Sequence, residues 1–301
     1  MVEIGVVFHP EVEPEALPGY AQDAEAAGID ELWLWEDCFR EGGLTTATAA
    51  LALTSSIRVA TGVLPMPLRN VALTAMEAAT ISRLFPGRFI LGVGHGVQSW
   101  MGQAGVRPAS PLTLMREYVP ALRALLAGER VTTTGRYVNL DHVALDWPPI
   151  APPPVWAAGE GAKTLALTGE LAEGTVLTGG TSADVAREAV AVIGEGRSAA
   201  GHPGAHPVAE FIMAVFADSP DAVPAARARL EAAWDHWDIA PERRGGVVGT
   251  PAEVAQQLQP WLDAGVTHLV LQPMEDADRT AFVRGAGEVA ALLRASTTPR
   301  G

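Results

Sequence analysis

The stretch LGVGHGVQSWMGQAG, residues Leu91–Gly105, is the part of this sequence on which the prediction of the fold depends. An apolar run, Phe89-Ile90-Leu91, leads into it, and glycines follow at the alternate positions 92, 94 and 96. The pattern predicts a short buried strand that breaks into a loop. Because glycine has no Cβ, these positions let the backbone approach another group closely.

The glycine spacing argues against a dinucleotide-binding loop. That fingerprint needs G-x-G-x-x-G at the start of a helix, and the third glycine would have to stand where Ser99 or Val97 stands. Two interpretations of the stretch stay open. It is the end of a strand in a β/α barrel, where active-site loops gather, or it is a close-packed turn of the kind found in any α/β protein.

Similar strand patterns recur before and after this stretch. Apolar runs followed by helical patterns predict strands at Glu3–Phe8, Glu31–Trp35, Arg58–Leu64, Phe89–Gly94, Val155–Ala158, Thr175–Thr178, Val208–Phe216 and His268–Gln272. Such alternation over 301 residues is typical of a (β/α)8 TIM barrel, an α/β fold, in one domain spanning residues 1–301. The alternative is a doubly wound open sheet in two domains, divided at the proline run 148–154.

The helical patterns carry start and stop signals. Asn70 is a predicted N-cap, and Thr250-Pro251-Ala252-Glu253 combines an N-cap threonine with proline at the first helical position and glutamate at N3. Between the fourth and fifth strands we predict an insertion that holds a helix over Pro111–Leu126 and a hairpin over Arg130–Leu140. Other helices are predicted at Pro14–Gly28, Gly43–Ser55, Val71–Leu84, Lys163–Glu170, Ser182–Ile193 and Arg279–Leu293, and from Ser219 toward Trp237.

Composition narrows the classes of partner. Lys plus Arg total 21 and Asp plus Glu total 35, which gives a formal net charge of −14. This acidic balance argues against nucleic acid or an anionic membrane as the main partner. Cys38 is the single cysteine, which excludes an intrachain disulfide and suits a reducing compartment. Because the sequence shows neither a signal-peptide pattern nor a membrane-length apolar run, we expect a cytoplasmic protein.

Glycine dominates the ends of the predicted strands, where a β/α barrel places its chemistry. GEGAKT (Gly159–Thr164) follows the fifth strand, and TGGTS (Thr178–Ser182) follows the sixth. Free backbone N–H groups at helix starts bind anions, and Lys163 adds positive charge, so we predict one phosphate site shared by both loops. Ordinary capped turns are the alternative. The sequence has no H-x-H, H-E-x-x-H or G-x-S-x-G motif, so we expect neither a metal nor a serine nucleophile.

Four segments resemble the bacterial luciferase-like flavin-dependent oxidoreductases, and most of all the branch that uses the deazaflavin coenzyme F420. They are ELWLWEDCF (Glu31–Phe39), the run Arg58–Gly96, KTLALTGELAEGTVLTGGT (Lys163–Thr181) and GTPAEVAQQL (Gly249–Leu258). The resemblance extends from Gly5 to about Leu293 and is specific for the family rather than for a substrate. It implies a (β/α)8 barrel with an insertion, with the flavin or deazaflavin ring in the mouth and its phosphate beside the fifth and sixth strands.

The resemblance also implies which residues bind the cofactor. Gly62-Val63 is expected to back the ring through a cis peptide bond, with a trans bond and a glycine bulge as the alternative. The ring and ribityl chain are expected beside Asp37, Gly94, His95, Gly96 and Gln98. The phosphate is expected beside Gly159, Glu160, Gly161, Ala162, Lys163, Thr178, Gly179 and Gly180.

The residues that supply the catalytic acid or base in relatives are different in this chain. F420-dependent sugar-phosphate and alcohol dehydrogenases of this family carry Asp-His after the second strand, whereas this chain has Asp37-Cys38. Val97 stands where some members carry a glutamate. We therefore predict that His95 takes over the proton transfer, with Asp37 and Cys38 as further candidates. The predicted substrate contacts, for which strand capping and core packing are the alternatives, are His9, Trp35 and Trp100.

The resemblance leaves three functions open. The first is an oxidoreductase that transfers a hydride between F420 and a small organic substrate. The second is a monooxygenase that uses O2 and reduced FMN supplied by a separate flavin reductase. The third is a flavin or F420 carrier without turnover. Members of the family commonly pair through helices beside strands two to four, which here implies a homodimer through Gly43–Ser55 and Val71–Leu84.

Overall fold

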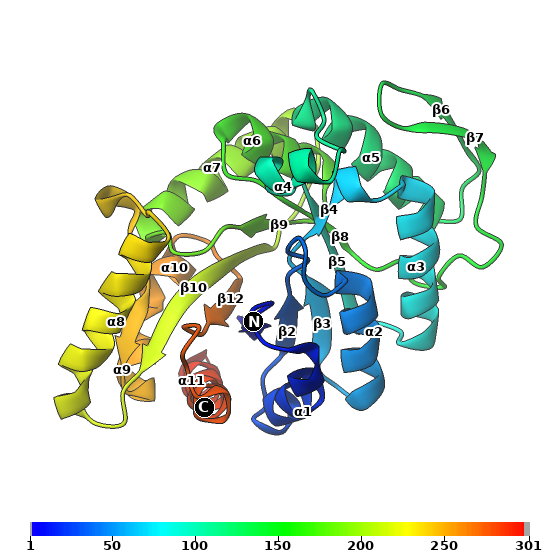
Figure 1. The fold of residues 1–301 in the computed structure, drawn as a ribbon. Helices are drawn as coiled ribbons and strands as arrows, with labels where there is room; N and C mark the ends of the chain where they lie inside the picture. The colour runs from blue at the N-terminus through cyan, green and yellow to red at the C-terminus, as the bar shows by residue number, and fades with distance from the viewer. Residues whose placement is uncertain (1, 298–301) are drawn as a thin grey trace.

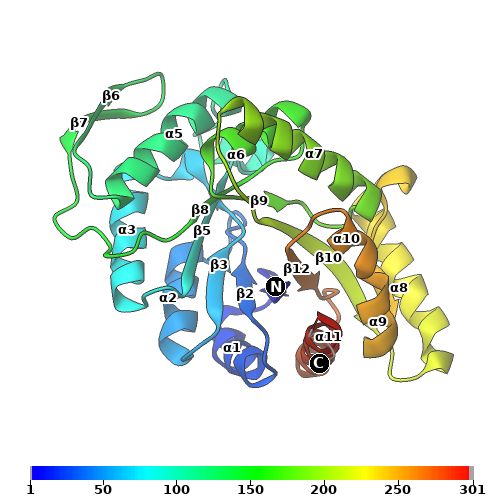
Figure 2. The same cartoon turned by 180° about the vertical axis from the view of Figure 1, so that it is seen from behind.

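Eight parallel strands close into a barrel in the computed structural model, which describes residues 2–297 (Figures 1 and 2). The strands are β1 (Glu3–Phe8), β2 (Glu31–Leu34), β3 (Arg58–Thr61), β5 (Phe89–Gly94), β8 (Val155–Ala158), β9 (Gly174–Leu177), β10 (Val208–Phe216) and β12 (His268–Gln272). Each strand pairs with the next in chain order, and β12 completes the ring by pairing with β10 and β1. This closure confirms the predicted (β/α)8 barrel and excludes the open doubly wound sheet.

Helices cover the outside of the barrel and connect its strands (Figure 1). They are α1 (Leu17–Ala26), α2 (Gly43–Leu53), α3 (Val71–Leu84), α5 (Pro111–Leu126), α6 (Ala162–Leu171), α7 (Ala183–Ala199), α8 (Val223–His236), α9 (Pro251–Gln257), α10 (Gln259–Asp263) and α11 (Arg279–Thr297). The side chain of Asn70 accepts a hydrogen bond from an N–H group in the first turn of α3, and Thr250 and Glu253 form a capping box on α9, as predicted. Within the described residues, no helix combines the length and apolar composition needed to cross a bilayer.

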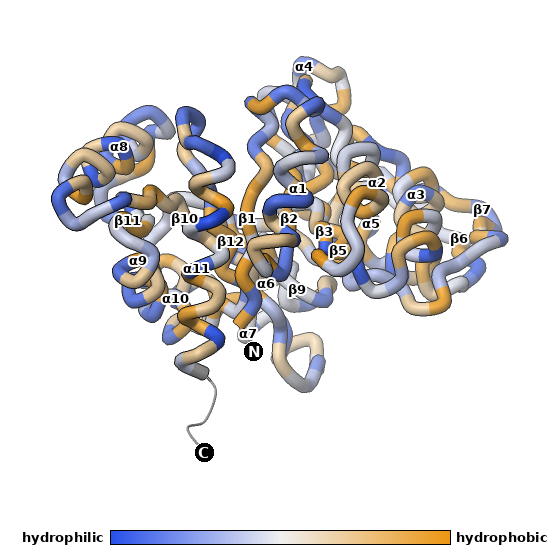
Figure 3. The backbone as a smooth tube through the Cα atoms, turned by 90° about the horizontal axis from the view of Figure 1, so that it is seen from below, coloured by the Kyte–Doolittle hydropathy of each residue, from blue (hydrophilic) through white to orange (hydrophobic). Residues whose placement is uncertain are grey.

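Apolar side chains fill two layers, one inside the barrel and one between the strands and the helices. Alternate residues of a strand point to opposite faces, so each strand contributes to both layers. Figure 3 shows the apolar residues, in orange, along the strands at the centre of the molecule. Inside the barrel, Trp33 lies edge-on to Phe211, with ring centroids 5.5 Å apart, and tilted against Trp156 at 5.8 Å. The interior of the barrel is therefore a packed core that ends below the mouth.

The segment between β5 and β8 is the predicted insertion. It holds the short helix α4 (Gln98–Gln103), α5, and an antiparallel hairpin of β6 (Val131–Thr134) and β7 (Asn139–Val143) beside α5 (Figure 1). The Glu117 carboxylate of α5 accepts hydrogen bonds from the backbone N–H groups of residues 136, 137 and 138, which fastens the hairpin turn to the helix. The hairpin is confirmed. Helix α4 was not predicted, because six residues are too few to show a helical period.

The predicted third strand is interrupted. β3 ends at Thr61, the Gly62–Val63 peptide bond is cis as predicted, and β4 (Leu64–Pro65) then pairs with β5. The second strand ends at Leu34, one residue before the predicted end. β11 (Val247–Gly249), which pairs with β10, was not predicted, because three residues leave no room for the alternating pattern that identifies a strand.

Gly92 and Gly94 face the neighbouring strand. A Cβ on Gly92 would lie 2.0 Å from the carbonyl oxygen of Thr61, and one on Gly94 would lie 2.6 Å from Cγ2 of Val63. The Thr61 hydroxyl also donates to the carbonyl oxygen of Gly92 and accepts from its N–H group, at 3.0 and 2.9 Å. Both interpretations of this stretch therefore hold, since it ends a barrel strand and the first two of its glycines serve close packing of the protein against itself.

Candidate active site

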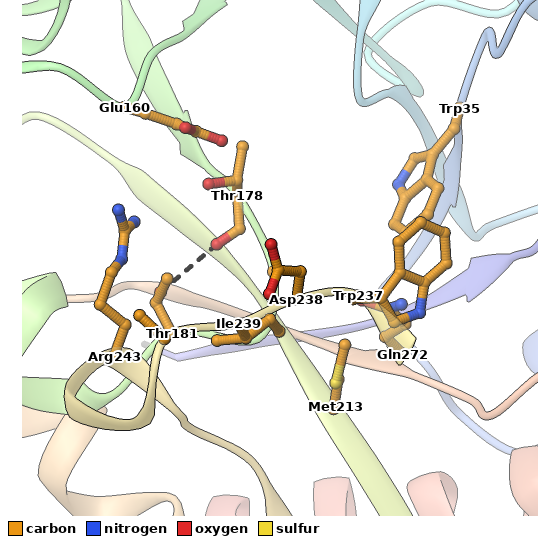
Figure 4. Close-up of a pocket in the computed structure, with 12 residues that line it drawn as sticks. Trp35, Glu160, Thr178, Thr181, Met213, Trp237, Asp238, Ile239, Arg243 and Gln272 are labelled. Carbon is orange, nitrogen blue, oxygen red and sulfur yellow. Dashed lines mark hydrogen bonds between the residues drawn. The ribbon is translucent and has the colours of Figure 1, made fainter. Parts of the chain in front are cut away.

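Two neighbouring cavities lie at the mouth of the barrel, and we call them together the recess. The larger has a volume of about 410 Å³ and the smaller about 290 Å³. Met213, Trp237 and Gln272 belong to the walls of both cavities. Further wall residues of the larger cavity are Trp35, Glu160, Thr178, Gly179, Thr181, Asp238, Ile239 and Arg243 (Figure 4). The recess thus lies where the carboxyl ends of β2, β9 and β12 meet, as expected for a barrel enzyme.

One side of the larger cavity is aromatic. The Trp35 ring, directly after β2, lies 5.2 Å from that of Phe211 and 5.0 Å from that of His9, measured between centroids. Trp237 lies on the same side of the cavity (Figure 4). Nε1 of Trp35 is buried and has no hydrogen-bond partner among the described residues. Because an unsatisfied buried donor costs about 1–3 kcal/mol, this position favours a ligand that accepts a hydrogen bond.

The other side of the larger cavity is polar and includes the glycine loop after β9. The Thr181 hydroxyl donates hydrogen bonds to Glu210 and, at 3.3 Å, to the carbonyl oxygen of Thr178. Gly180 has a φ of +78°, a backbone conformation that residues with a side chain rarely adopt. Ser182 caps α7 immediately afterwards, and Arg243 lies beside this loop, across the cavity from the tryptophans (Figure 4). A glycine-rich loop beside a guanidinium group suits an anion such as a phosphate.

Glu210 lies below this loop, on β10, and is fully buried. Burial raises the pKa of Glu210 to about 8, against the opposing effects of the Thr181 hydrogen bond and the charge of Arg243. Its Oε2 atom has no hydrogen-bond partner in the described part of the chain. The carboxyl group is therefore mostly neutral at pH 7 and does not repel an anion bound at the loop above it.

The loop Gly159–Lys163, the second predicted phosphate element, reaches the recess through Glu160. Gly161 is the N-cap of α6 and provides no side-chain cap, so the first N–H groups of the helix lack intrahelical partners. Ala162 and Lys163 are exposed. Neither Ala162 nor Lys163 is among the described residues that line the two cavities.

The loop after β5 holds His95, the residue predicted to transfer the proton. Nε2 of His95 is buried without a hydrogen-bond partner among residues 2–297, and burial lowers the pKa of the ring. The Gln98 amide donates to the carbonyl oxygens of His95 and Gly96, both at 3.2 Å, and so holds the turn together. The described walls of the recess do not include His95, Gln98 or Trp100, which lie on other parts of the mouth.

Asp37 and Cys38 follow Trp35 in the chain. Burial, with a smaller effect of the Glu11 carboxylate, raises the pKa of Asp37. Burial and the carboxylates of Glu36 and Asp37 raise the pKa of the Cys38 thiol, which keeps it protonated and argues against a nucleophilic role. The peptide bond between Cys38 and Phe39 is cis, which was not predicted. In the described chain, no group of three or more His, Cys, Asp or Glu side chains is placed to hold a metal ion.

Two of the three predicted substrate residues line the recess, Trp35 in the larger cavity and His9 in the smaller, whereas several other wall residues were not predicted. His9 follows β1, is 4% exposed and lines the smaller cavity. Gln272 ends a predicted strand at the mouth of the barrel but was not among the predicted site residues. The segment Trp237–Arg243, between α8 and β11, carries no motif, so its place in the wall depends on how the chain folds back over the mouth.

Comparison with known proteins places similar sequences in one family of oxidoreductases. A family model described as luciferase-like monooxygenase matches residues 3–245. The 5,10-methylenetetrahydromethanopterin reductase of Methanolobus tindarius is 28% identical over 304 residues, which cover 88% of this chain and 92% of the relative. An F420-dependent glucose-6-phosphate dehydrogenase of Kineococcus radiotolerans is 28% identical over 319 residues, which cover 93% and 94% of the two chains.

Solved structures share the fold over almost the whole chain. An F420-dependent secondary alcohol dehydrogenase in complex with an F420–acetone adduct superposes with a TM-score of 0.83 at 21% identity, covering 97% of this chain and 99% of the other. The oxygenating constituent of 3,6-diketocamphane monooxygenase from Pseudomonas putida, in complex with FMN, gives 0.79 at 18% identity and 96% of both chains. At these identities the likeness is one of fold.

Proposed function

Since this chain belongs to the luciferase-like monooxygenase family, we propose that it is an oxidoreductase that transfers a hydride between coenzyme F420 and a small organic substrate. The observation that carries the proposal is the recess at the mouth of the barrel, with a glycine loop and Arg243 on one side and, on the other, an indole N–H that has no partner among the described residues. Relatives named for F420 match most of the chain and support a deazaflavin rather than a flavin.

The residues of the recess fit such a cofactor. Thr178, Gly179 and Arg243 would hold its phosphate beside the start of α7, and the Trp35 N–H would donate to a polar atom of the bound molecule. Gly62–Val63, where the predicted cis bond occurs, would lie behind the ring. When bound, the deazaflavin supplies a ring carbon that accepts or donates the hydride.

The other wall residues would orient and shield the reacting groups. Trp35, Trp237 and Met213 present apolar surface that keeps water away from the transferred hydride. Gln272 is 4% exposed and faces both cavities, so it is well placed to orient a polar group of the substrate. We therefore assign the larger cavity to the cofactor and the smaller to the substrate.

FMN is the alternative cofactor, because the fold is shared with an FMN-dependent monooxygenase. Thermal unfolding with each cofactor discriminates between the two, since a tight ligand raises the melting temperature by mass action. Oxidised F420 is then mixed with 2-propanol or glucose 6-phosphate, and loss of its visible absorbance is followed.

Each outcome of these measurements has a distinct meaning. Stabilisation by F420 with loss of its absorbance supports the proposal. Stabilisation by FMN alone, with O2 consumption when a flavin reductase is added, would replace it with a monooxygenase. Stabilisation without turnover of any probe would favour a carrier, and no stabilisation by either cofactor would contradict all three.

We also propose that the protein is a homodimer that pairs through α2 and α3. Leu53 of α2 and Leu73, Met76 and Leu84 of α3 are large apolar side chains with exposed fractions of 41, 47, 57 and 62%. Small residues such as alanine along both helices would let a second copy approach closely. Large apolar side chains gathered in the exposed positions of two packed helices are typical of an interface.

A further inference from the structure

Both ring nitrogens of the buried His9 have partners. Oε2 of Glu11 lies 2.7 Å from Nδ1, and the amide nitrogen of Gln272 lies 3.3 Å from Nε2. A carboxylate accepts hydrogen bonds, whereas an amide nitrogen donates them. This pattern places the proton of the neutral ring on Nδ1 and leaves the lone pair of Nε2 on the side of Gln272.

The two sides of the ring have different surroundings. His9 and Gln272 line the smaller cavity, and Gln272 also lines the larger one (Figure 4). On the other side, the Glu11 side chain is 25% exposed and lies 3.2 Å from the Arg40 guanidinium group. The His9 imidazole therefore connects the recess with a carboxylate that has access to solvent.

Charged groups approach this pair from three directions. Asp37 and Arg40 lie in the segment after β2, and Asp37 interacts electrostatically with both members of the pair. Across the smaller cavity lie Arg229 and His236 of α8 and Glu275 and Asp276 after β12, and Arg229 is paired with Asp276. Among these carboxylates in the described structure, Glu11 is the one that hydrogen-bonds the His9 ring.

We propose that His9 is the catalytic acid and base of this enzyme, that Glu11 is its positioning residue, and that the substrate carries a hydroxyl or carbonyl group. The inference rests on the proposed function. In the oxidation direction, the alcohol O–H bond breaks and its proton goes to Nε2 of His9. The C–H bond breaks at the same carbon, and its hydride goes to the oxidised deazaflavin, so that a carbonyl compound, an imidazolium and the reduced cofactor result. Reduction runs the same step backwards.

The structure favours this pair over the residues predicted from the sequence. An adjacent carboxylate fixes the imidazole tautomer and stabilises the imidazolium, which is how carboxylates support catalytic histidines elsewhere. Within residues 2–297, the ring of His95 has no such partner at its buried Nε2. Cys38 keeps its proton, for the reasons given above, and lines neither described cavity wall.

The first test needs no cofactor. Long-range proton–nitrogen spectra of protein labelled with ¹⁵N-histidine distinguish the two neutral tautomers, and the His9→Gln variant identifies the signal. We expect His9 to be protonated on Nδ1 in the neutral ring, and Glu11→Gln to change that signal. His142→Gln, at an exposed position of the hairpin, is the control and leaves the His9 signal unchanged. A neutral ring protonated on Nε2 would overturn the assignment.

The second test measures turnover with F420 and the alcohol that the wild type oxidises fastest. We expect kcat to fall about 10²- to 10⁴-fold in His9→Gln, the usual range for removal of a general base, while the Kd for F420 changes less than about threefold. Glu11→Gln should lower kcat less and displace the pH profile of kcat, and Glu11→Asp should restore part of the loss. Melting temperatures confirm that the variants are folded.

The outcomes separate this inference from the proposed function. A folded His9→Gln variant that keeps more than half of kcat at every pH would overturn the role of His9 and leave the F420 enzyme intact. A wild type that binds no F420 would contradict the proposed function, and the pair would then be structural even if the tautomer is as expected. A wild type that oxidises only substrates without a hydroxyl group would overturn the substrate class.

Discussion

At the scale of single residues, the recess depends on buried polar groups that are only partly satisfied. Trp35 has an unpaired indole N–H, and Glu210 has one carboxyl oxygen without a partner in the described residues. Buried polar groups in native proteins are generally hydrogen-bonded, so groups left unsatisfied beside a cavity point to a ligand or to a functional constraint. The effect of each can be measured.

Glu210 should make the protein less stable as the pH rises. Its pKa is about 8 in the folded protein, above the ordinary value of a carboxyl group, so between pH 5 and 8 the folded state binds a proton that the unfolded state has lost. Stability falls with pH wherever the folded state binds more protons. At pH 8, Glu210→Gln should raise the free energy of unfolding by about 2–4 kcal/mol relative to the wild type. At pH 4, where both states are protonated, the difference should almost vanish.

Urea unfolding at the two pH values measures this difference. A gain of equal size at pH 4 and pH 8 would show that the carboxyl group is not neutral in the folded protein, and that the substitution acts through packing instead.

Arg243, in the wall of the recess, and Lys163, which lines neither cavity in the described structure, should differ in their effect on cofactor binding. Arg243 lines the larger cavity, so Arg243→Gln should raise the Kd for F420 roughly 10- to 100-fold. This corresponds to the loss of one charge-assisted hydrogen bond, which contributes about 1.5–3 kcal/mol. Lys163→Ala tests the prediction from the sequence that Lys163 contributes as well. Fluorescence titration with F420 compares the two, and unchanged affinity in both would place the phosphate elsewhere.

At the scale of elements, the glycines divide into those that packing requires and those that it does not. Gly92 lets β5 approach β3, because a Cβ there would lie 2.0 Å from a backbone oxygen. Gly194 lies in the exposed part of α7, and a Cβ there would meet no described atom within 4 Å apart from its chain neighbours and the backbone of its own helix. The same substitution at the two positions should therefore act in opposite directions.

We expect Gly92→Ala to destabilise the protein strongly, since two barrel strands would have to separate. Gly194→Ala should stabilise it by about 0.5–1 kcal/mol, because alanine has the better helix propensity. Denaturation midpoints measure both. A Gly92→Ala protein as stable as the wild type would mean that β3 and β5 lie far enough apart at Thr61 and Gly92 to accommodate a Cβ.

At the scale of the whole molecule, the outer faces of α2 and α3 carry the apolar side chains that we assign to a dimer interface. Met76→Glu would place a charge in the centre of that surface, where it would be buried without a partner. We expect light scattering to report a dimer for the wild type at micromolar concentration and a monomer for Met76→Glu. Leu292→Glu, at a position of α11 with 44% exposure, is the control and should remain dimeric. A monomeric wild type would contradict the interface.

The sequence by itself determined the order and type of the barrel elements. β1, β5, β8, β10 and β12 have the predicted bounds, because each is a run of apolar residues between turn signals. The caps at Asn70 and Thr250 were predictable for the same reason, since they depend on contacts within four residues. The repeated strand–helix units also reduced the fold to two arrangements of a parallel sheet, a closed barrel and an open doubly wound sheet, and the pairing of β1 with β12 decided between them.

Only the tertiary structure decided which side chains meet at the mouth. His9 and Gln272 are 263 positions apart, and they come together because β1 and β12 are neighbours in the closed ring. Arg243 reaches the glycine loop through an irregular segment that no periodicity describes. The glycines of β5 illustrate the same limit. Their spacing predicts a close approach but not its partners, which are Thr61 for Gly92 and Val63 for Gly94. Local patterns fix local conformation, whereas the composition of a site depends on contacts between segments far apart in the chain.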